Sequence, residues 1–138
     1  MAIWNRKDIM SVQSFILKVV NNSCPEMKAL MEGPRTDTRV NLTMVVLVIP
    51  VNNGKLQLPQ TFPTVTMDFS LTGVGIVLDK QHSLDEVILG VRWEKEMTYL
   101  RAKAKHLSPM GGGFYRLGLE MVEIVPASKY PQLNLARI

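Results

Sequence analysis

The sequence contains a single cysteine, Cys24, among its 138 residues. One cysteine excludes an internal disulfide framework and an all-cysteine metal site. The longest apolar run, from Met44 to Val51, is broken by Pro50 and is too short to span a bilayer. Residues 1–8 include no apolar stretch and no cleavage site, so we expect no secretory signal. These absences favour a cytoplasmic protein without membrane insertion.

Motifs of catalysis and cofactor binding are also missing. Residues 73–75 place two glycines in a strand-like context, and glycines 111–113 are not followed by a lysine or a helix, so neither is a phosphate loop or a dinucleotide fingerprint. His82 and His106 stand alone, without the spacing of metal ligands. Cys24 could pair with a histidine as a nucleophile, but a free cysteine more commonly behaves as a small buried hydrophobe. We therefore expect no enzyme, no metal and no cofactor.

The residues that are present describe an ordinary globular domain with a basic segment. Hydrophobic residues make up 46% of the chain and charged residues 20%, with 16 basic against 12 acidic side chains. The whole excess lies between residues 97 and 119, which contain no acidic residue. This basic segment could face an anion, or it could be a solvated strand face. Its four basic residues are Arg101, Lys103, Lys105 and Arg116.

Hydrophobic periodicity changes at Pro34. Before it, apolar residues at helical spacing predict a helix over residues 8–20, and a capping box at 23–26 predicts a second short helix that Gly33 ends. After it, β-branched residues and hairpin-length connectors predict antiparallel strands, with Asn53–Gly54 as a strong hairpin turn. The expected strands cover about residues 40–51, 61–70, 73–78, 87–93, 98–107 and 114–125.

Short strands with hairpin-length connectors predict an antiparallel barrel. In residues 98–107 the basic side chains point one way, whereas Leu100, Ala102 and Ala104 point the other, as a half-buried strand requires. We therefore expect an all-β fold: an antiparallel β-barrel, residues 34–126, with a helical N-terminal extension, residues 1–33. Residues 127–138 form a C-terminal tail, which is too short and too broken by proline to assign.

Two short motifs stand out within this pattern. Arg35 and Arg39 form an R-x-x-x-R motif before the first long strand, and Asp68, Ser70 and Gly73 form a D-x-S-x-x-G motif about thirty residues later. In this order and inside an all-β pattern, they resemble the PilZ domain, a bacterial receptor module for cyclic di-GMP. The resemblance covers residues 34–125, including the run from Phe114 to Met121, which is similar to the last barrel strand of the family.

The residue types suit the ligand that the resemblance implies. Arginine binds phosphate with two parallel hydrogen bonds and also matches the O6 and N7 atoms of guanine. Asp68 can accept hydrogen bonds from guanine N–H groups, and Ser70, two residues on, would share its strand face. Gly73 would permit a positive φ or a close approach to the ligand. The resemblance implies that Arg35 and Arg39 clamp the ligand, while Asp68, Ser70 and Gly73 read its bases.

The expected protein is a cyclic di-GMP receptor that relays the signal to an unidentified protein partner, in the control of motility, biofilm or exopolysaccharide. Binding would order residues 34–39. Pro34 departs from many family members at a position that influences stoichiometry, so one and two bound ligands both stay open. Two alternatives are a degenerate PilZ module that binds only protein and a small basic barrel that binds single-stranded nucleic acid. Few aromatic residues accompany the basic strand, which disfavours nucleic acid.

Overall fold

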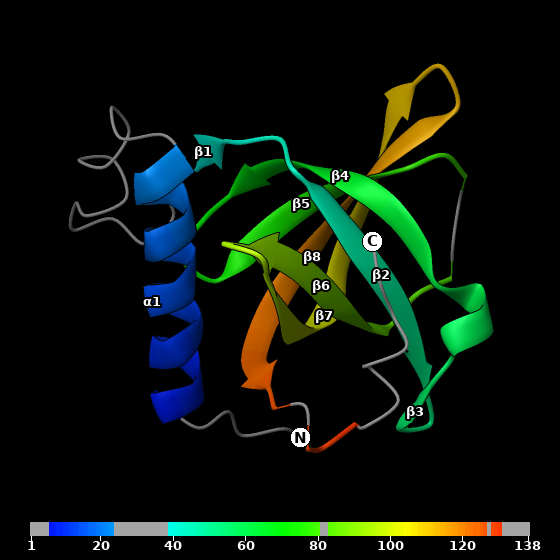
Figure 1. Ribbon diagram of the computed structural model, residues 1–138. Helices are drawn as coiled ribbons and strands as arrows, with labels where there is room; N and C mark the ends of the chain where they lie inside the picture. Colours follow the sequence, from blue (N-terminus) through cyan, green and yellow to red (C-terminus); the bar gives the residue numbers. More distant parts are fainter. Residues whose placement is uncertain (1–5, 24–38, 81–82, 127, 131–138) are drawn as a thin grey trace.

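The computed structural model describes residues 6–23, 39–80, 83–126 and 128–130, and its strands close into an antiparallel barrel (Figure 1). The ring runs β2–β4–β5–β8–β7–β6 and returns to β2, because β2 pairs with both β4 and β6. Strand β1 pairs with β4, and β3 pairs with β2. The elements are α1 (Arg6–Ser23), β1 (Val40–Asn41), β2 (Val45–Asn52), β3 (Lys55–Leu56), the short 3-10 helix η2 (Leu58–Gln60), β4 (Phe62–Phe69), β5 (Gly73–Leu78), β6 (Glu86–Trp93), β7 (Glu96–Gly111) and β8 (Phe114–Val125).

Most strand boundaries in the structure lie close to those expected from the sequence. Asn53 and Gly54 both have positive φ, 53° and 76°, and join β2 to β3 as the predicted hairpin turn. The one strand expected over residues 40–51 is two strands, β1 and β2, separated by residues 42–44. Thr66 of β4 spans this gap: its hydroxyl donates to the carbonyl of Leu42 (2.7 Å) and accepts from the amide of Met44 (3.0 Å).

The inward-facing side chains of the strands, which are alternate residues along each strand, fill the barrel interior. On β7, Leu100 and Ala102 are fully buried, which confirms the alternation predicted for this strand. Thr66 is the one buried polar residue in the described part of the chain, and its two hydrogen bonds satisfy its hydroxyl. The core includes Val46, Val48, Phe69, Ile76, Leu89, Leu100, Leu119 and Met121.

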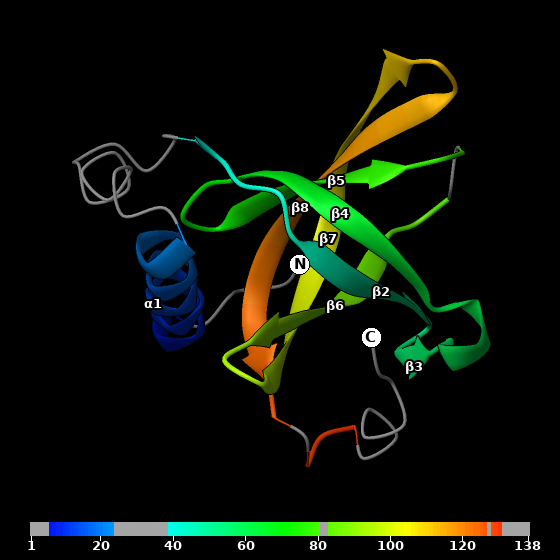
Figure 2. The same ribbon diagram turned by 45° about the horizontal axis from the view of Figure 1, so that its top comes forward.

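Helix α1 packs against β8 and stands beside the barrel (Figures 1 and 2). The predicted helix over residues 8–20 is confirmed and is slightly longer at both ends. Val12, Ile16 and Val19 are buried at helical spacing, and Val12 and Ile16 belong to the same core cluster as the strands. The second expected helix lies outside the described residues. No helix in the described ranges is long and apolar enough to cross a membrane.

Strands β7 and β8 are longer than the others and form a hairpin that projects beyond the barrel (Figures 1 and 2). The register of β7 with β6 ends at Lys103, whereas its register with β8 continues to Gly111. The expected end of this strand, Leu107, is therefore too early. Gly111, Gly112 and Gly113 all have positive φ and make the turn, which explains three consecutive glycines without a phosphate-binding role.

Candidate ligand-binding site

A β-bulge turns Asp68 toward the outside of the barrel. The register of β4 with β5 shifts between Thr66 and Asp68, so that Met67 is an extra residue in the strand. Without this shift, Asp68 would lie on the same inward face as Thr66, because strand side chains alternate with period two. With it, Phe69 points into the core and Asp68 lies at the surface, with 14% of its side chain exposed.

Strand β1 brings Arg39 to Asp68 from 29 residues away in sequence. Asn41 lies opposite Asp68 and Val40 lies opposite Phe69, so Arg39 immediately precedes the paired residues. Its Nη1 donates to Oδ1 of Asp68 at 3.3 Å, while 61% of the Arg39 side chain is exposed. The structure thus joins one residue from each predicted motif. Arg35, the other arginine of the first motif, lies outside the described residues.

A third residue, Arg116 of β8, completes this group. Its Nη2 donates to Oδ1 of Asp68 at 2.8 Å and its Nε donates to Oδ2 at 3.3 Å, which is a two-point contact between guanidinium and carboxylate. Its side chain is 21% exposed. We refer to Arg39, Asp68 and Arg116 as the Asp68 cluster. In the sequence, Arg116 belongs to the basic segment and to the run that resembles the last barrel strand of the family, and neither feature assigns it to the site.

The D-x-S-x-x-G motif also has a structural role in the turn between β4 and β5. Ser70 lies one residue beyond β4 and so does not share a strand face with Asp68. Its Oγ accepts from the amide of Gly73 at 3.0 Å, and its amide donates to the carbonyl of Gly73 at 2.9 Å. Gly73 does not have a positive φ; instead, a Cβ there would lie 2.9 Å from Oγ of Ser70. The close approach at Gly73 is therefore to Ser70 of the same turn.

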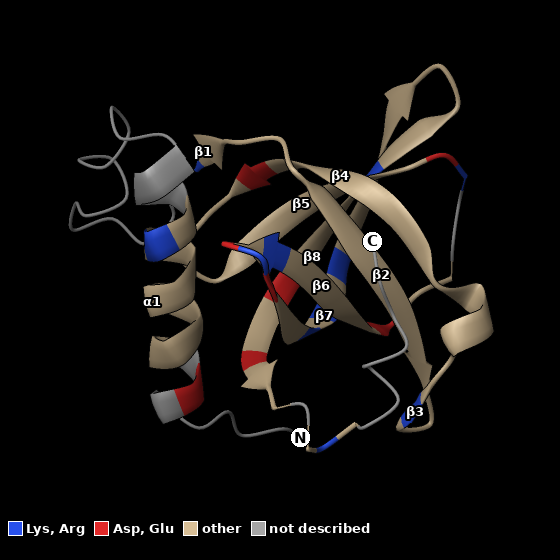
Figure 3. Ribbon diagram, in the orientation of Figure 1, with Lys and Arg blue, Asp and Glu red and all other residues tan. Residues whose placement is uncertain are grey.

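Arg101 and Lys105 of β7 have acidic partners on neighbouring strands, and Figure 3 shows that both basic and acidic residues occur on the strands of the barrel. Arg101 contacts Glu86 of β6 at 3.4 Å and Glu123 of β8 at 3.3 Å. Lys129 contacts Glu123 at 3.1 Å, and Lys105 contacts Glu120 at 3.2 Å. The absence of acidic residues from the basic segment is therefore a property of the sequence order and not of the folded surface. We refer to Glu86, Arg101, Glu123 and Lys129 as the Glu123 cluster.

Opposing effects act on the carboxyl group of Glu123. Burial acts to raise its pKa, but hydrogen bonds from Lys129 and Arg101, together with their positive charges, outweigh burial and hold the pKa below its usual range. Glu123 is therefore ionised and paired at neutral pH. In the part of the chain that the structure describes, no group of three or more His, Cys, Asp or Glu side chains is arranged to hold a metal ion.

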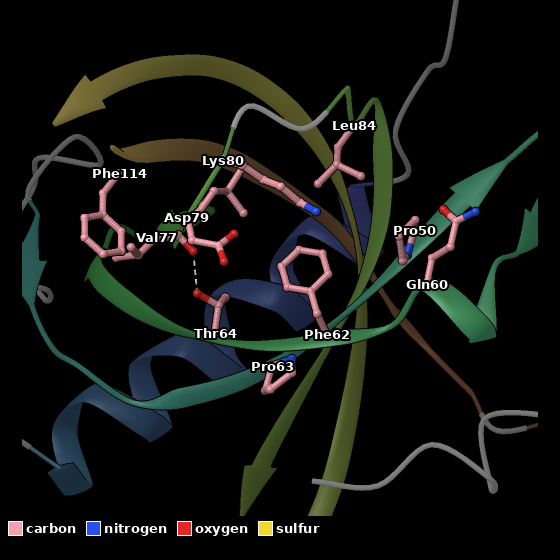
Figure 4. A pocket seen from close by; sticks show the side chains of 11 residues that line it. Pro50, Gln60, Phe62, Pro63, Thr64, Val77, Asp79, Lys80, Leu84 and Phe114 are labelled. Carbon is pink, nitrogen blue, oxygen red and sulfur yellow. Dashed lines mark hydrogen bonds between the residues drawn. The ribbon is translucent and has the colours of Figure 1, made fainter. Parts of the chain in front are cut away.

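A cavity of about 700 Å³ lies at the other end of the β4–β5 hairpin (Figure 4). It is lined by the beginning of β4 and the end of β5, where the Thr64 hydroxyl donates to the carbonyl of Val77. Phe62 and Phe114 supply aromatic side chains, and Lys80 supplies a cation among the lining residues that the structure describes. None of the predicted site residues that the structure describes, Arg39, Asp68, Ser70 and Gly73, lines it. Asp68 lies four residues after Thr64 along β4, a distance of roughly 13 Å, so this cavity is distinct from the Asp68 cluster.

Comparisons with known proteins show the fold. No family model and no curated protein matches the sequence. Among solved structures, the chain is similar to the inhibitor of motility MotI/DgrA of Bacillus subtilis, with a TM-score of 0.50, 17% identity and coverage of 70% of this chain and 46% of that one. It also matches PlzA of Borreliella burgdorferi in complex with cyclic di-GMP, with a TM-score of 0.47, 11% identity and coverage of 91% and 60%.

The similarity to MotI/DgrA and the strand order confirm the fold class expected from the sequence: an antiparallel PilZ-like β-barrel with a helical N-terminal extension. The chain spans 46% of the length of the first neighbour and 60% of that of the second, so both contain regions with no counterpart here. At these identities the comparison extends to architecture only.

Proposed function

We propose that this chain is a PilZ-type receptor for cyclic di-GMP that acts without catalysis through a protein partner. The observation that supports it best is the contact between Arg39 and Asp68, because it joins the two motifs that the family resemblance rests on. Two guanidinium groups share one carboxylate there, which leaves an excess of one positive charge beside an exposed arginine. Such a site favours a ligand with phosphate groups.

The proposed binding mode gives each residue a separate task. Arg39, together with Arg35, binds phosphate and guanine, because the planar guanidinium matches both. Asp68 accepts from guanine N–H groups. Ser70 and Gly73 hold the turn that carries Asp68 and can offer a further polar contact. To reach a phosphate, Arg39 must break its contact with Asp68. This movement would alter the surface around β1, to which a cytoplasmic partner would bind.

Calorimetric titration of the full chain with cyclic di-GMP tests the proposal. We expect saturable binding to cyclic di-GMP, much weaker binding to GMP, and a much lower affinity for a single-stranded DNA oligonucleotide. Tighter binding to the oligonucleotide than to cyclic di-GMP would support the nucleic-acid alternative. Absence of cyclic di-GMP binding by a folded protein would support the alternative of a PilZ module that binds only a protein. In this proposal the protein partner carries the signal to the process that it controls, such as motility, biofilm formation or exopolysaccharide production.

A further inference from the structure

The two arginines of the Asp68 cluster hold the carboxylate unequally. Arg116 makes two hydrogen bonds to it, the shorter at 2.8 Å, and has 21% of its side chain exposed. Arg39 makes one hydrogen bond at 3.3 Å and is 61% exposed. An exposed arginine with a single long contact is easily displaced, since such pairs contribute little to stability. Arg116 is therefore the fixed partner of Asp68, and Arg39 is the exchangeable one.

Two glycines leave room for the guanidinium of Arg116 on the surface of the sheet. Gly75 of β5 lies opposite Asp68 on one side and opposite Gly118 of β8 on the other, so the three form a row across three strands. A Cβ at Gly75 would lie 2.6 Å from Nη2 and 2.7 Å from Cζ of Arg116, and a Cβ at Gly118 would lie 3.3 Å from Nη1. The guanidinium thus occupies space that a side chain at residue 75 would fill, and a side chain at residue 118 would press against it.

We propose that Arg116 is a positioning residue that sets the base selectivity of the site. This inference rests on the proposed function. A carboxylate offers about four lone-pair positions, and Arg116 takes one on each oxygen of Asp68 while Arg39 takes another on Oδ1. When Arg39 leaves for a ligand phosphate, Oδ1 becomes free to accept a guanine N–H. Arg116 keeps the carboxylate in the orientation in which that hydrogen bond forms, and adenine offers no matching N–H at the N1 position.

Two variants of the full chain test this role in complementary ways. Arg116→Gln removes the two-point contact. Gly75→Ala keeps every charge but forces the guanidinium aside, at low cost to the fold because the obstructing atoms are the end of a flexible side chain. Arg101→Gln is the matched control, since Arg101 is 22% exposed and also contacts carboxylates on neighbouring strands. The readout is the ratio of affinities for cyclic di-GMP and cyclic di-AMP, two ligands of equal charge, with thermal melting as a check on folding.

We expect Arg116→Gln to lower the selectivity for cyclic di-GMP about tenfold, the worth of one hydrogen bond to a charged group. Gly75→Ala should lower it in the same direction, and Arg101→Gln should leave it unchanged. If Arg116→Gln does not fold, Gly75→Ala decides the question alone. Selectivity retained in every folded variant of Arg116 or Gly75 overturns the inference while the proposed function stands. A wild-type chain that binds no cyclic di-GMP overturns the proposed function and this inference with it.

Discussion

The Asp68 cluster and the Glu123 cluster both join basic side chains to carboxylates on the same sheet, but they differ in net charge. In each, an arginine that is about one-fifth exposed contacts at least one carboxylate on another strand. In the Asp68 cluster two arginines share one carboxylate, so one positive charge is in excess. In the Glu123 cluster two carboxylates meet one arginine and one lysine, so the charges cancel. The number of basic residues in a segment is therefore a weaker indicator of anion binding than the number of carboxylates that contact them.

The largest effect is expected when the carboxylate of the Asp68 cluster is removed. Asp68→Ala leaves Arg116, which is mostly buried, without the partner of its two hydrogen bonds. We expect a loss of about 1–3 kcal/mol in the free energy of unfolding, the usual cost of an unsatisfied buried polar group. The variant should also lose discrimination between cyclic di-GMP and cyclic di-AMP more than it loses overall attraction for phosphate.

Urea unfolding and paired titrations measure both effects for Asp68→Ala. The matched substitution is Asp85→Ala, at an exposed aspartate in the segment that precedes β6. If the wild type binds both cyclic dinucleotides equally, Asp68 does not read the base and its assignment is wrong.

Removing the Ser70 hydroxyl tests how far the site extends into the turn. Ser70→Ala leaves the Gly73 amide without its acceptor, and we expect a loss of about 1 kcal/mol in the free energy of unfolding. Because this hydroxyl already accepts a hydrogen bond, we expect the change in ligand affinity to be smaller than for Asp68→Ala. A fall in affinity as large as that of Asp68→Ala, without a change in stability, would instead make Ser70 a direct ligand contact.

We expect the Glu123 cluster to make the stability of the fold depend on pH, without an effect on ligand affinity. The pKa of Glu123 is lower in the folded chain than its ordinary value, so the folded state favours the ionised form. The resulting stabilisation is present above the ordinary pKa and is lost as pH falls through the lowered one. We expect Glu123→Gln to be less stable than the wild type at pH 7, by under about 1 kcal/mol. Thermal melts should converge at acidic pH, and a difference that persists there would contradict this account.

The smallest effect is expected when the basic side chains of β7 are neutralised together. Arg101, Lys103 and Lys105 point outward, and Arg101 and Lys105 already have acidic partners. A triple glutamine variant should keep most of its cyclic di-GMP affinity at physiological salt and lose a few-fold at low salt, where long-range attraction is screened less. An affinity loss at physiological salt as complete as that of Arg39→Ala would place β7 inside the site.

Much of the fold could be predicted because it follows from local patterns. Alternation on β7, the helical spacing of Val12 and Ile16, and the Asn53–Gly54 turn each depend on residues close together in sequence. The end of β7 could not be predicted in this way. Ser108 and Pro109 are residue types typical of turns, and register shifts after Ala104 and after Pro109 interrupt the alternation of the strand.

The candidate site likewise contains residues that local motifs indicate and residues that only long-range strand pairing brings together. Asp68 and Arg39 were found through short motifs, and the structure brings them into contact. The bulge at Met67, which turns Asp68 outward, depends on pairing with β5, and the sequence of β4 contains no signal for it. Arg116 lies 48 residues from Asp68 in sequence, and the glycines that make room for it come from two strands. A glycine on the outer face of each of two neighbouring strands is the signal that could have pointed to Arg116.

The most direct measurement compares one arginine from each cluster in the same titration. Arg39→Ala and Arg101→Gln each remove one positive charge, and neither change should unfold the chain, as circular dichroism would verify. We predict that Arg39→Ala weakens cyclic di-GMP binding about 10- to 100-fold at physiological salt, from the loss of a hydrogen bond to a charged group, whereas Arg101→Gln changes it less than twofold. Equal affinity for wild type and folded Arg39→Ala, or an equal loss in both variants, would contradict the assignment of ligand binding to the Asp68 cluster.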